Sequence, residues 1–187
     1  MLILFAILAV LVLYVVYSFN SFVTYTNRSK EASSDIDVQL KRRYDLIPNL
    51  INTVKGYADH EKSTFDSVIN ARNQAMAAMA SGSASFDDKA KAENALSGTL
   101  KSLFALTESY PDLKANANFL DLQHELTDTE DKIQAARRFF NSNVRDLNTA
   151  LEVFPGNMIG NLFHFQKMEL FDLPDNDAAQ NPVEVKF

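Results

Sequence analysis

Residues 112–153, DLKANANFLDLQHELTDTEDKIQAARRFFNSNVRDLNTALEV, decide the fold. Steps of four and three alternate along this stretch and mark one series of mostly apolar positions: Phe119, Gln123, Leu126, Glu130, Ile133, Arg137, Phe140, Val144, Leu147 and Leu151. This spacing places the side chains on one face of an α-helix, because about 3.6 residues make one turn. The stretch therefore predicts a long amphipathic helix that packs against other helices. FPGN, residues 154–157, ends it.

Three more segments of the chain show helical spacing. Apolar or small residues step by three or four through residues 19–44, 47–79 and 90–107. The small residues of ASGSAS, 80–85, predict the connection between the second and third segments. Pro111 disfavours helical geometry in the residue before it, so the third helix must end there.

Pro48 predicts the boundary between the first two helices. Proline lacks a backbone N–H, so it fits the first turn of a helix and not its interior. Asp45 is a suitable N-cap for a helix that starts at this point. We therefore expect a break at residues 43–46 and a second helix that runs without interruption from 47 to 79.

Four amphipathic helices with short connections bury their apolar faces most economically as a bundle. The sequence therefore predicts an all-α protein whose residues 19–171 form one antiparallel four-helix-bundle domain. We expect the aromatic piece MIGNLFHF, 158–165, to pack back onto this bundle. Residues 172–187 lack apolar periodicity and are predicted to form a disordered acidic tail.

The N-terminus is a predicted transmembrane anchor. Residues 1–17, MLILFAILAVLVLYVVY, are all apolar or aromatic, and the first charged side chain is Arg28. About 20 apolar residues suffice to cross a bilayer. The alternative is a cleaved secretory signal, but its basic start, shorter apolar stretch and small-x-small cleavage site are not found in convincing form. We expect residues 1–18 to be retained as a single span.

Basic residues predict the orientation of this span. No Lys or Arg precedes it, whereas five follow it: Arg28, Lys30, Lys41, Arg42 and Arg43. Cytoplasmic segments next to a span carry the excess of Lys and Arg. We expect the N-terminus outside and the helical domain in the cytoplasm, at the bacterial inner membrane. A periplasmic domain is the alternative.

Composition excludes several classes of function. The 187 residues carry 18 Lys and Arg against 24 Asp and Glu, a formal net charge of −6, so no basic excess is present to neutralise a nucleic-acid backbone. The absence of Cys excludes disulfides, thiolate nucleophiles and Cys-ligated metals. The chain fits one compact domain plus an extra segment, without a nucleic-acid partner.

The common catalytic and cofactor motifs are missing. A di-iron bundle needs Glu-x-x-His on two helices, and no Glu of this chain has a His three positions later. The 5 glycines do not cluster as a phosphate-binding loop requires. No Ser or Thr near a His forms a nucleophile elbow. We therefore predict no enzyme, with no catalytic, cofactor-binding or metal-binding residue; a hydrolase without these signatures is one alternative.

One string resembles a phospho-accepting helix. HELTDT, which starts at His124, opens like that helix of a histidine kinase. It lacks the Pro that this family has shortly after the His, and no residues remain for a nucleotide-binding domain. The favoured interpretation is a solvated His beside Glu125. A histidine phosphocarrier that uses His124 or His60 in a signalling relay is the alternative function.

Polar residues interrupt the apolar helix faces at five positions: Glu61, Arg72, Gln123, Glu130 and Arg137. The second and fourth helices of an up-down bundle run parallel, and counting from their starts places Arg72 level with Arg137. The same count places Glu61 roughly level with Glu130. Because buried charges must be paired, the arrangement predicts a salt-bridge network that fixes helix register. A ligand or proton site in the core is the alternative.

Several stretches resemble the LemA family: DIDVQLKRRYDLIPNLINTVKGYADHE (35–61), YPDLKAN (110–116), NFLDLQHELTDTEDKI (118–133) with ARRFFN after it, and FPGN. The resemblance extends from about Phe19 to Phe171. It implies a bacterial single-pass membrane protein with a four-helix bundle and its N-terminus outside, and it supplies no agreed catalytic residue. We therefore expect a non-enzymatic protein of the bacterial cell envelope that presents a surface to a protein partner.

Overall fold

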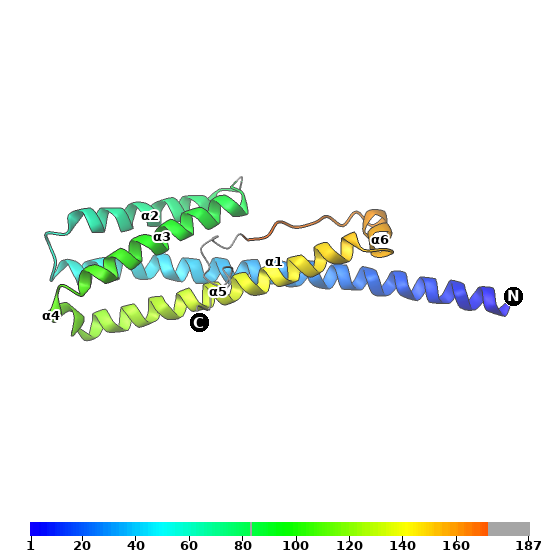
Figure 1. Cartoon of the computed structure of the whole chain (residues 1–187), viewed down its shortest axis with the longest axis horizontal. Helices are drawn as coiled ribbons and strands as arrows, with labels where there is room; N and C mark the ends of the chain where they lie inside the picture. The colour runs from blue at the N-terminus through cyan, green and yellow to red at the C-terminus, as the bar shows by residue number, and fades with distance from the viewer. Residues whose placement is uncertain (83, 172–187) are drawn as a thin grey trace, which may run out of the picture. The chain divides into compact units, whose positions relative to one another are not determined.

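A computed structural model describes residues 1–82 and 84–171, which form six helices and no strand (Figure 1). The helices are α1 (Leu2–Lys55), α2 (Lys62–Ala80), α3 (Phe86–Thr107), α4 (Pro111–Lys114), α5 (Ala117–Glu152) and α6 (Gly156–Leu162). The all-α prediction is confirmed. The predicted acidic tail, residues 172–187, lies outside the described residues.

The described chain divides into two compact units. Unit 1 contains residues 1–36 and 133–170, and unit 2 contains residues 37–132 and Phe171. The helices α1 and α5 each contribute residues to both units. The finer expectation of one antiparallel four-helix bundle over residues 19–171 stays a prediction.

Unit 2 is built from four helical segments: the last part of α1, α2, α3 and the first part of α5, with the single turn of α4 between the last two. Each segment contributes buried apolar side chains, among them Leu40, Ile47, Leu50, Val54, Phe65, Val68, Leu96, Leu103, Phe119 and Leu126. Because these positions recur every three or four residues, the periodicity of the sequence accounts for the core of this unit.

The predicted break at residues 43–46 is wrong. Helix α1 continues through Pro48 to Lys55, and the next helix begins at Lys62 rather than at residue 47. Proline in a helix interior deprives the carbonyl four residues earlier of its donor, and that carbonyl belongs to Tyr44. The Nε of Arg72 donates a 2.7 Å hydrogen bond to the Tyr44 carbonyl oxygen. A side chain from α2 therefore replaces the donor that Pro48 lacks.

The connection before α3 lies where its small residues predicted it, whereas the single helix expected over residues 112–153 is divided into α4, which ends at Lys114, and α5, which begins at Ala117. Helix α2 ends at Ala80, and Ser85 caps α3 by accepting a 3.1 Å hydrogen bond from the backbone N–H of Asp88. The Asp88 carboxylate accepts in return from the Ser85 backbone N–H, which completes a capping box. Pro111 occupies the first turn of α4, where its missing N–H costs nothing.

Unit 1 packs the chain after α5 against the N-terminal half of α1. Phe22, Leu147 and Ile159 form its buried centre. The ring of Phe163 lies edge-on to Phe19, with centroids 4.9 Å apart, and the ring of Phe165 lies in the same way against Phe22 at 5.3 Å. The piece MIGNLFHF thus packs back onto the helices, as its aromatic composition predicted.

Two glycines permit the close approach of α6 to the end of α5. A Cβ at Gly156 would lie 2.3 Å from the carbonyl oxygen of Ala150, and one at Gly160 would lie 2.5 Å from Cδ2 of Leu151. The first contact is with rigid backbone and the second with the end of a flexible side chain. The glycine of FPGN, Gly156, is therefore required because no Cβ fits between α6 and the backbone of α5. This requirement adds to the role of FPGN in ending α5.

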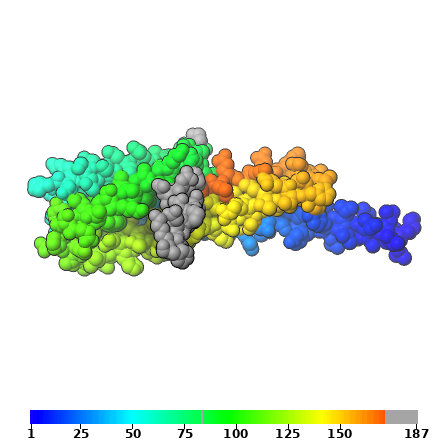
Figure 2. All heavy atoms as spheres, viewed as in Figure 1, coloured from blue at the N-terminus to red at the C-terminus, as the bar shows by residue number. Residues whose placement is uncertain are grey.

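The first turns of α1 form a bare apolar surface (Figure 2). The side chains from Met1 to Leu4 are between 68% and 94% exposed. By length and composition the N-terminal part of α1 is able to cross a membrane, and almost none of it is buried by other residues. A soluble core helix of the same composition would be mostly buried.

Candidate functional site

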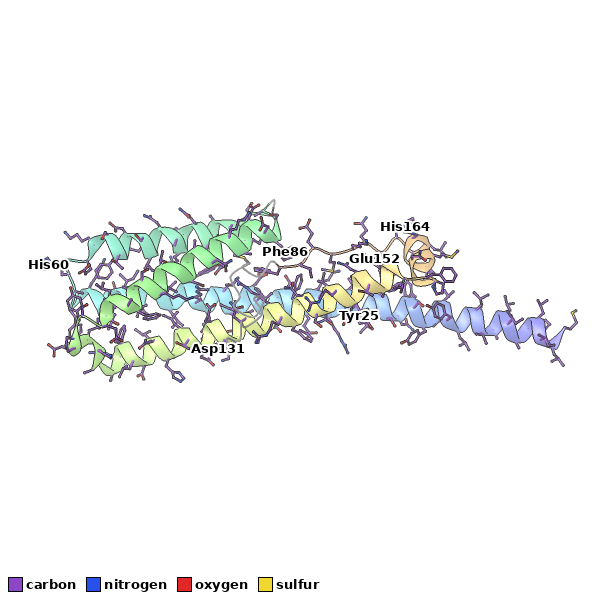
Figure 3. All side chains as sticks on the ribbon, viewed as in Figure 1. Tyr25, His60, Phe86, Asp131, Glu152 and His164 are labelled. Carbon is purple, nitrogen blue, oxygen red and sulfur yellow. The ribbon has the colours of Figure 1, made fainter. Side chains whose placement is uncertain are left out.

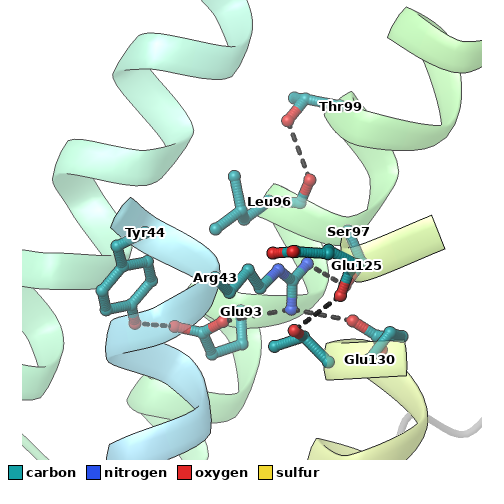
Figure 4. A network of polar contacts seen from close by, with 9 residues as sticks. Arg43, Tyr44, Glu93, Leu96, Ser97, Thr99, Glu125 and Glu130 are labelled. Atoms are coloured by element: carbon teal, nitrogen blue, oxygen red, sulfur yellow. Dashed lines mark hydrogen bonds and ion pairs between the residues drawn. The ribbon is translucent and has the colours of Figure 1, made fainter. Parts of the chain in front are cut away.

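The most developed polar site among the described residues lies inside unit 2 and is centred on Arg43 of α1 (Figure 4). The Arg43 side chain is 2% exposed. Its Nη1 lies 3.4 Å from Oε2 of Glu93 on α3 and 3.0 Å from Oε2 of Glu130 on α5. Its Nη2 donates a 2.6 Å hydrogen bond to Oγ of Ser97. One guanidinium therefore joins three helical segments.

Glu93 is the acidic centre of this network. Its side chain is only 1% exposed. One carboxylate oxygen contacts Arg43, and the other accepts a hydrogen bond from the hydroxyl of Tyr44. A carboxylate with this little access to water is stable only with such partners, because desolvation of an isolated charge costs several kcal/mol. Both oxygens of Glu93 are thus bound by residues of α1.

Tyr44 links α1 to two other helices through different atoms. Its hydroxyl binds Glu93 of α3, and its backbone carbonyl accepts from Arg72 of α2. Arg43 and Tyr44 are adjacent in the sequence, so a single turn of α1 makes ion pairs or hydrogen bonds with all three neighbouring helical segments. The network is therefore placed to fix the register of the helices in unit 2.

The neighbouring arginine has a different environment. Arg42 pairs with Glu125 at 3.7 Å, and the side chains are 46% and 49% exposed. Such an ion pair at the surface contributes little to stability. Of two adjacent arginines, one is in the core of the network and one is at its rim.

The structure places the five predicted polar residues in different environments. Glu61 precedes α2 and accepts a 3.2 Å hydrogen bond from the hydroxyl of Tyr110. Glu130 binds Arg43. The sequence marked Arg43 only as one of the basic residues that follow the span and not as a member of the polar network. Arg137 is 1% exposed, which excludes a solvated surface position for it. Gln123 is half-buried.

The register count behind the predicted polar layers is wrong. It started the second helix at residue 47, whereas α2 begins at Lys62, so Glu61 is not part of a helix shared with Ile47. Arg72 donates to the Tyr44 carbonyl. The idea of buried ion pairs that join the helices applies to unit 2 with Arg43 and Glu93 as its central pair.

The pKa of Tyr110, the residue before α4, is raised by its surroundings. Partial burial is the main cause that raises the pKa of Tyr110 above its ordinary value, and the hydrogen bond to Glu61 and the negative charge of that residue act in the same direction. Tyr110 therefore remains protonated at neutral pH and acts as a hydrogen-bond donor.

The sequence did carry a signal for part of the network. Glu93 and Ser97 are spaced by four residues in the same series as Ala90 and Leu100 of α3, where apolar residues were expected. A charged residue in an apolar series requires a buried partner. Arg43 gave no such signal, because it stands in the run KRR and resembles an ordinary solvated charge.

The three histidines are all exposed. His60 lies in the connection between α1 and α2, and His164 follows α6 (Figure 3). His124 lies on α5. Within residues 1–82 and 84–171, no group of three or more His, Cys, Asp or Glu side chains is placed to hold a metal ion.

Comparison with known proteins gives relatives over most of the chain. Protein LemA of Metamycoplasma hominis is 27% identical, over 95% of this chain and 78% of that protein. Magnetosome protein MamQ of Magnetospirillum gryphiswaldense is 23% identical, over 88% of this chain and 68% of that protein. Magnetosome protein MamQ 2 of Paramagnetospirillum magneticum is 22% identical over the same shares. The profile of the LemA family matches residues 32–187, so the chain belongs to the LemA family.

Proposed function

We propose that this chain is a non-enzymatic helical protein of the bacterial cell envelope, anchored by residues 1–18, whose helical domain presents a surface to a protein partner. The observation that carries the proposal is the bare apolar surface of α1: this long apolar stretch leaves almost none of its side chains buried. Burial in lipid compensates for this exposure, because apolar side chains gain free energy when they leave water.

The orientation in the proposal has the N-terminus outside and the helical domain in the cytoplasm of an inner-membrane protein. Its support is the excess of Lys and Arg after the span and their absence before it. A protease-cleavable tag at Phe187 tests it. The tag is expected to be protected from external protease in intact spheroplasts, and cleavage there contradicts this orientation.

The bonds around Arg43 support a structural role for the network. Both oxygens of Glu93 bind residues of α1. The Ser97 hydroxyl accepts from the guanidinium of Arg43, which does not act as a general base. The network therefore resembles a register-fixing ion-pair cluster more than a site that activates a nucleophile.

Fractionation tests the anchor, and cross-linking tests the partner. The full chain is expected in the membrane fraction after alkaline washing, whereas a variant without residues 1–18 is expected to be soluble and strongly helical. A soluble full chain contradicts the anchor. Cross-linking in native membranes followed by mass spectrometry is expected to join the helical domain to one protein reproducibly, and its failure to do so contradicts partner presentation.

The alternative function is a histidine phosphocarrier, for which His60 and His124 are sufficiently exposed. A phosphohistidine is labile in acid and stable in base. Acid-labile phosphate on the purified protein that disappears in His60→Gln or His124→Gln would favour this alternative over partner presentation.

A further inference from the structure

The turn after α5 carries a second exposed apolar surface, which we name the α6 tip and define as residues 153–163. Four of its apolar side chains are more than half exposed: Val153, Phe154, Met158 and Leu162. Phe154 is 79% exposed. The sequence of the tip, VFPGNMIGNLF, contains no charged residue. Such a cluster is unusual for a surface in water, where large apolar patches mark binding sites.

The folding of the tip does not require these exposed side chains. Its inner face consists of Gly156, Ile159 and Gly160, which are buried. Met158 and Leu162 lie on the same short helix but remain 63% and 69% exposed. The outer face of α6 therefore carries two large exposed apolar side chains beside the exposed amide of Asn161.

The tip is continuous with the apolar part of α1. An open hollow in unit 1 is lined by Ile3, Ala6, Ile7, Val10, Leu11 and Tyr14 of α1 and by Phe154 and Pro155 of the tip. Every one of these residues is apolar or aromatic. Whatever covers this face of α1 therefore also meets Phe154.

Charged residues stand only at the base of the tip. Glu152 and Lys167 form an ion pair of 2.6 Å, and both side chains are more than half exposed. Glu152 and His164 flank the tip in Figure 3. An apolar end with charges at its base has the polarity of an element that enters the boundary between headgroups and acyl chains.

The backbone of the tip is largely satisfied within the tip and the end of α5. The N–H of Asn157 donates to Val153 at 2.9 Å, that of Met158 to Pro155 at 3.1 Å, and that of Phe163 to Ile159 at 3.0 Å. Pro155 has no N–H to desolvate. Contact with lipid requires this property, because unsatisfied backbone groups are costly in an apolar medium.

We propose that the α6 tip inserts into the lipid surface beside the N-terminal span, as a second membrane contact of the protein. The inference rests on the proposed anchoring by residues 1–18. Tyr14 lies four residues before Ser18, a distance of about 6 Å along a helix. Interfacial elements bury to about 5–10 Å. The hollow that Phe154 lines also contains Ile3, which lies fifteen residues before Ser18, or about 22 Å along the helix. Phe154 therefore lies beside the proposed span and not beyond its end at Ser18.

Tryptophan fluorescence tests the insertion, because the chain contains no Trp of its own. Phe154→Trp in the full chain is reconstituted in phosphatidylcholine vesicles with brominated acyl chains, which quench a Trp only at contact. Leu11→Trp in the proposed span is the positive control. Phe139→Trp is the matched negative control, since Phe139 is also an exposed phenylalanine but lies thirteen residues, or about 20 Å, before Glu152 along α5.

The proposal predicts several-fold quenching of Phe154→Trp and Leu11→Trp relative to unbrominated vesicles, and none of Phe139→Trp. Quenching of Leu11→Trp alone overturns the tip contact and leaves the anchor intact. Absence of quenching in all three variants overturns the anchor and the tip contact together. A blue-shifted but unquenched Phe154→Trp means that protein covers the tip, which also overturns lipid contact. Quenching of Met158→Trp provides a second, independent measurement of contact between the tip and lipid. A helical circular dichroism spectrum confirms the fold of each variant.

Discussion

Arg72 supplies, from a different helix, the hydrogen bond that Pro48 denies to Tyr44. Its Nε lies 2.7 Å from the Tyr44 carbonyl oxygen, which is the acceptor of residue 48 in an uninterrupted α-helix. This relationship explains how α1 continues from Leu2 to Lys55 with a proline in its interior. It also makes the roles of positions 48 and 72 interdependent.

A double-mutant cycle tests that dependence. Arg72→Met is expected to lower the free energy of unfolding by about 1–3 kcal/mol, because a poorly solvated carbonyl loses its donor. The same substitution is expected to cost much less in a Pro48→Ala background, where the new N–H of residue 48 binds the Tyr44 carbonyl. Urea unfolding followed by circular dichroism measures both values. Equal costs in the two backgrounds contradict the replacement of one donor by the other.

Arg43 is expected to be essential for the stability of unit 2. Arg43→Met leaves Glu93 buried without its cationic partner, so we expect a loss of about 3–5 kcal/mol in the free energy of unfolding. Adding Glu93→Gln is expected to recover much of that loss, because the fully buried carboxylate is removed and the Tyr44 hydroxyl keeps an acceptor, while Glu130, whose side chain is 35% exposed, remains in contact with water. The measurement is again urea unfolding.

The adjacent arginine is the control for this experiment. Arg42→Met removes an exposed ion pair and is expected to cost less than about 1 kcal/mol. If Arg43→Met melts like Arg42→Met, the buried network does not stabilise the helices.

The two glycines of α6 are expected to respond differently to a methyl group. Gly156→Ala places its Cβ against the carbonyl oxygen of Ala150, which is fixed backbone, so we expect a loss of about 1–3 kcal/mol through overpacking. Gly160→Ala meets the end of the Leu151 side chain, which is able to rotate, and is expected to cost less. Thermal unfolding ranks the two variants, and the reverse order contradicts the packing described for unit 1.

The capping box of α3 predicts a pH dependence. Hydrogen bonds from the Ser85 hydroxyl and backbone lower the pKa of Asp88 below its ordinary value of 3.8. A lowered pKa in the folded state gives stability that is present above 3.8 and is lost as the pH falls through the pKa of the folded state. Ser85→Ala is expected to move the pKa of Asp88 back toward the ordinary value, as measured by NMR titration of its carboxyl group.

Ser102→Ala is the control for the titration. Ser102 lies on the same helix, and its hydroxyl donates only to the carbonyl of Gly98. Its removal is expected to leave the pKa of Asp88 unchanged. An unchanged pKa in Ser85→Ala as well would mean that the capping box does not hold the Asp88 carboxylate.

The sequence predicted most of the helices because apolar spacing is a local property. The connection at 80–85 and the end of α5 were predicted from small residues, proline and glycine. The boundary between α1 and α2 was not, because the donor that stabilises Pro48 is a side chain 24 residues further along the chain. Local rules for proline contain no information about such a partner.

The polar site was predictable only in part, for a similar reason. Glu93 stands in an apolar series and therefore indicates a buried charge, but its partner Arg43 stands among other basic residues. Only the fold distinguishes Arg43 from Arg42, since one is 2% and the other 46% exposed. Sequence patterns predict that a buried acid needs a base, and the three-dimensional arrangement selects which base it is.

The acceptor of the Arg72 bond is a backbone atom, and this has a consequence for inheritance. No substitution at position 44 removes that acceptor, so a lineage that exchanges Tyr44 for phenylalanine gives up the contact with Glu93 and still keeps the one with Arg72. In a lineage that replaces Pro48, the new backbone N–H of residue 48 binds the Tyr44 carbonyl, and a donor side chain at position 72 is no longer needed for this hydrogen bond. The need for an arginine at position 72 therefore depends on the proline at position 48 and not on the side chain of Tyr44, whose backbone Arg72 contacts.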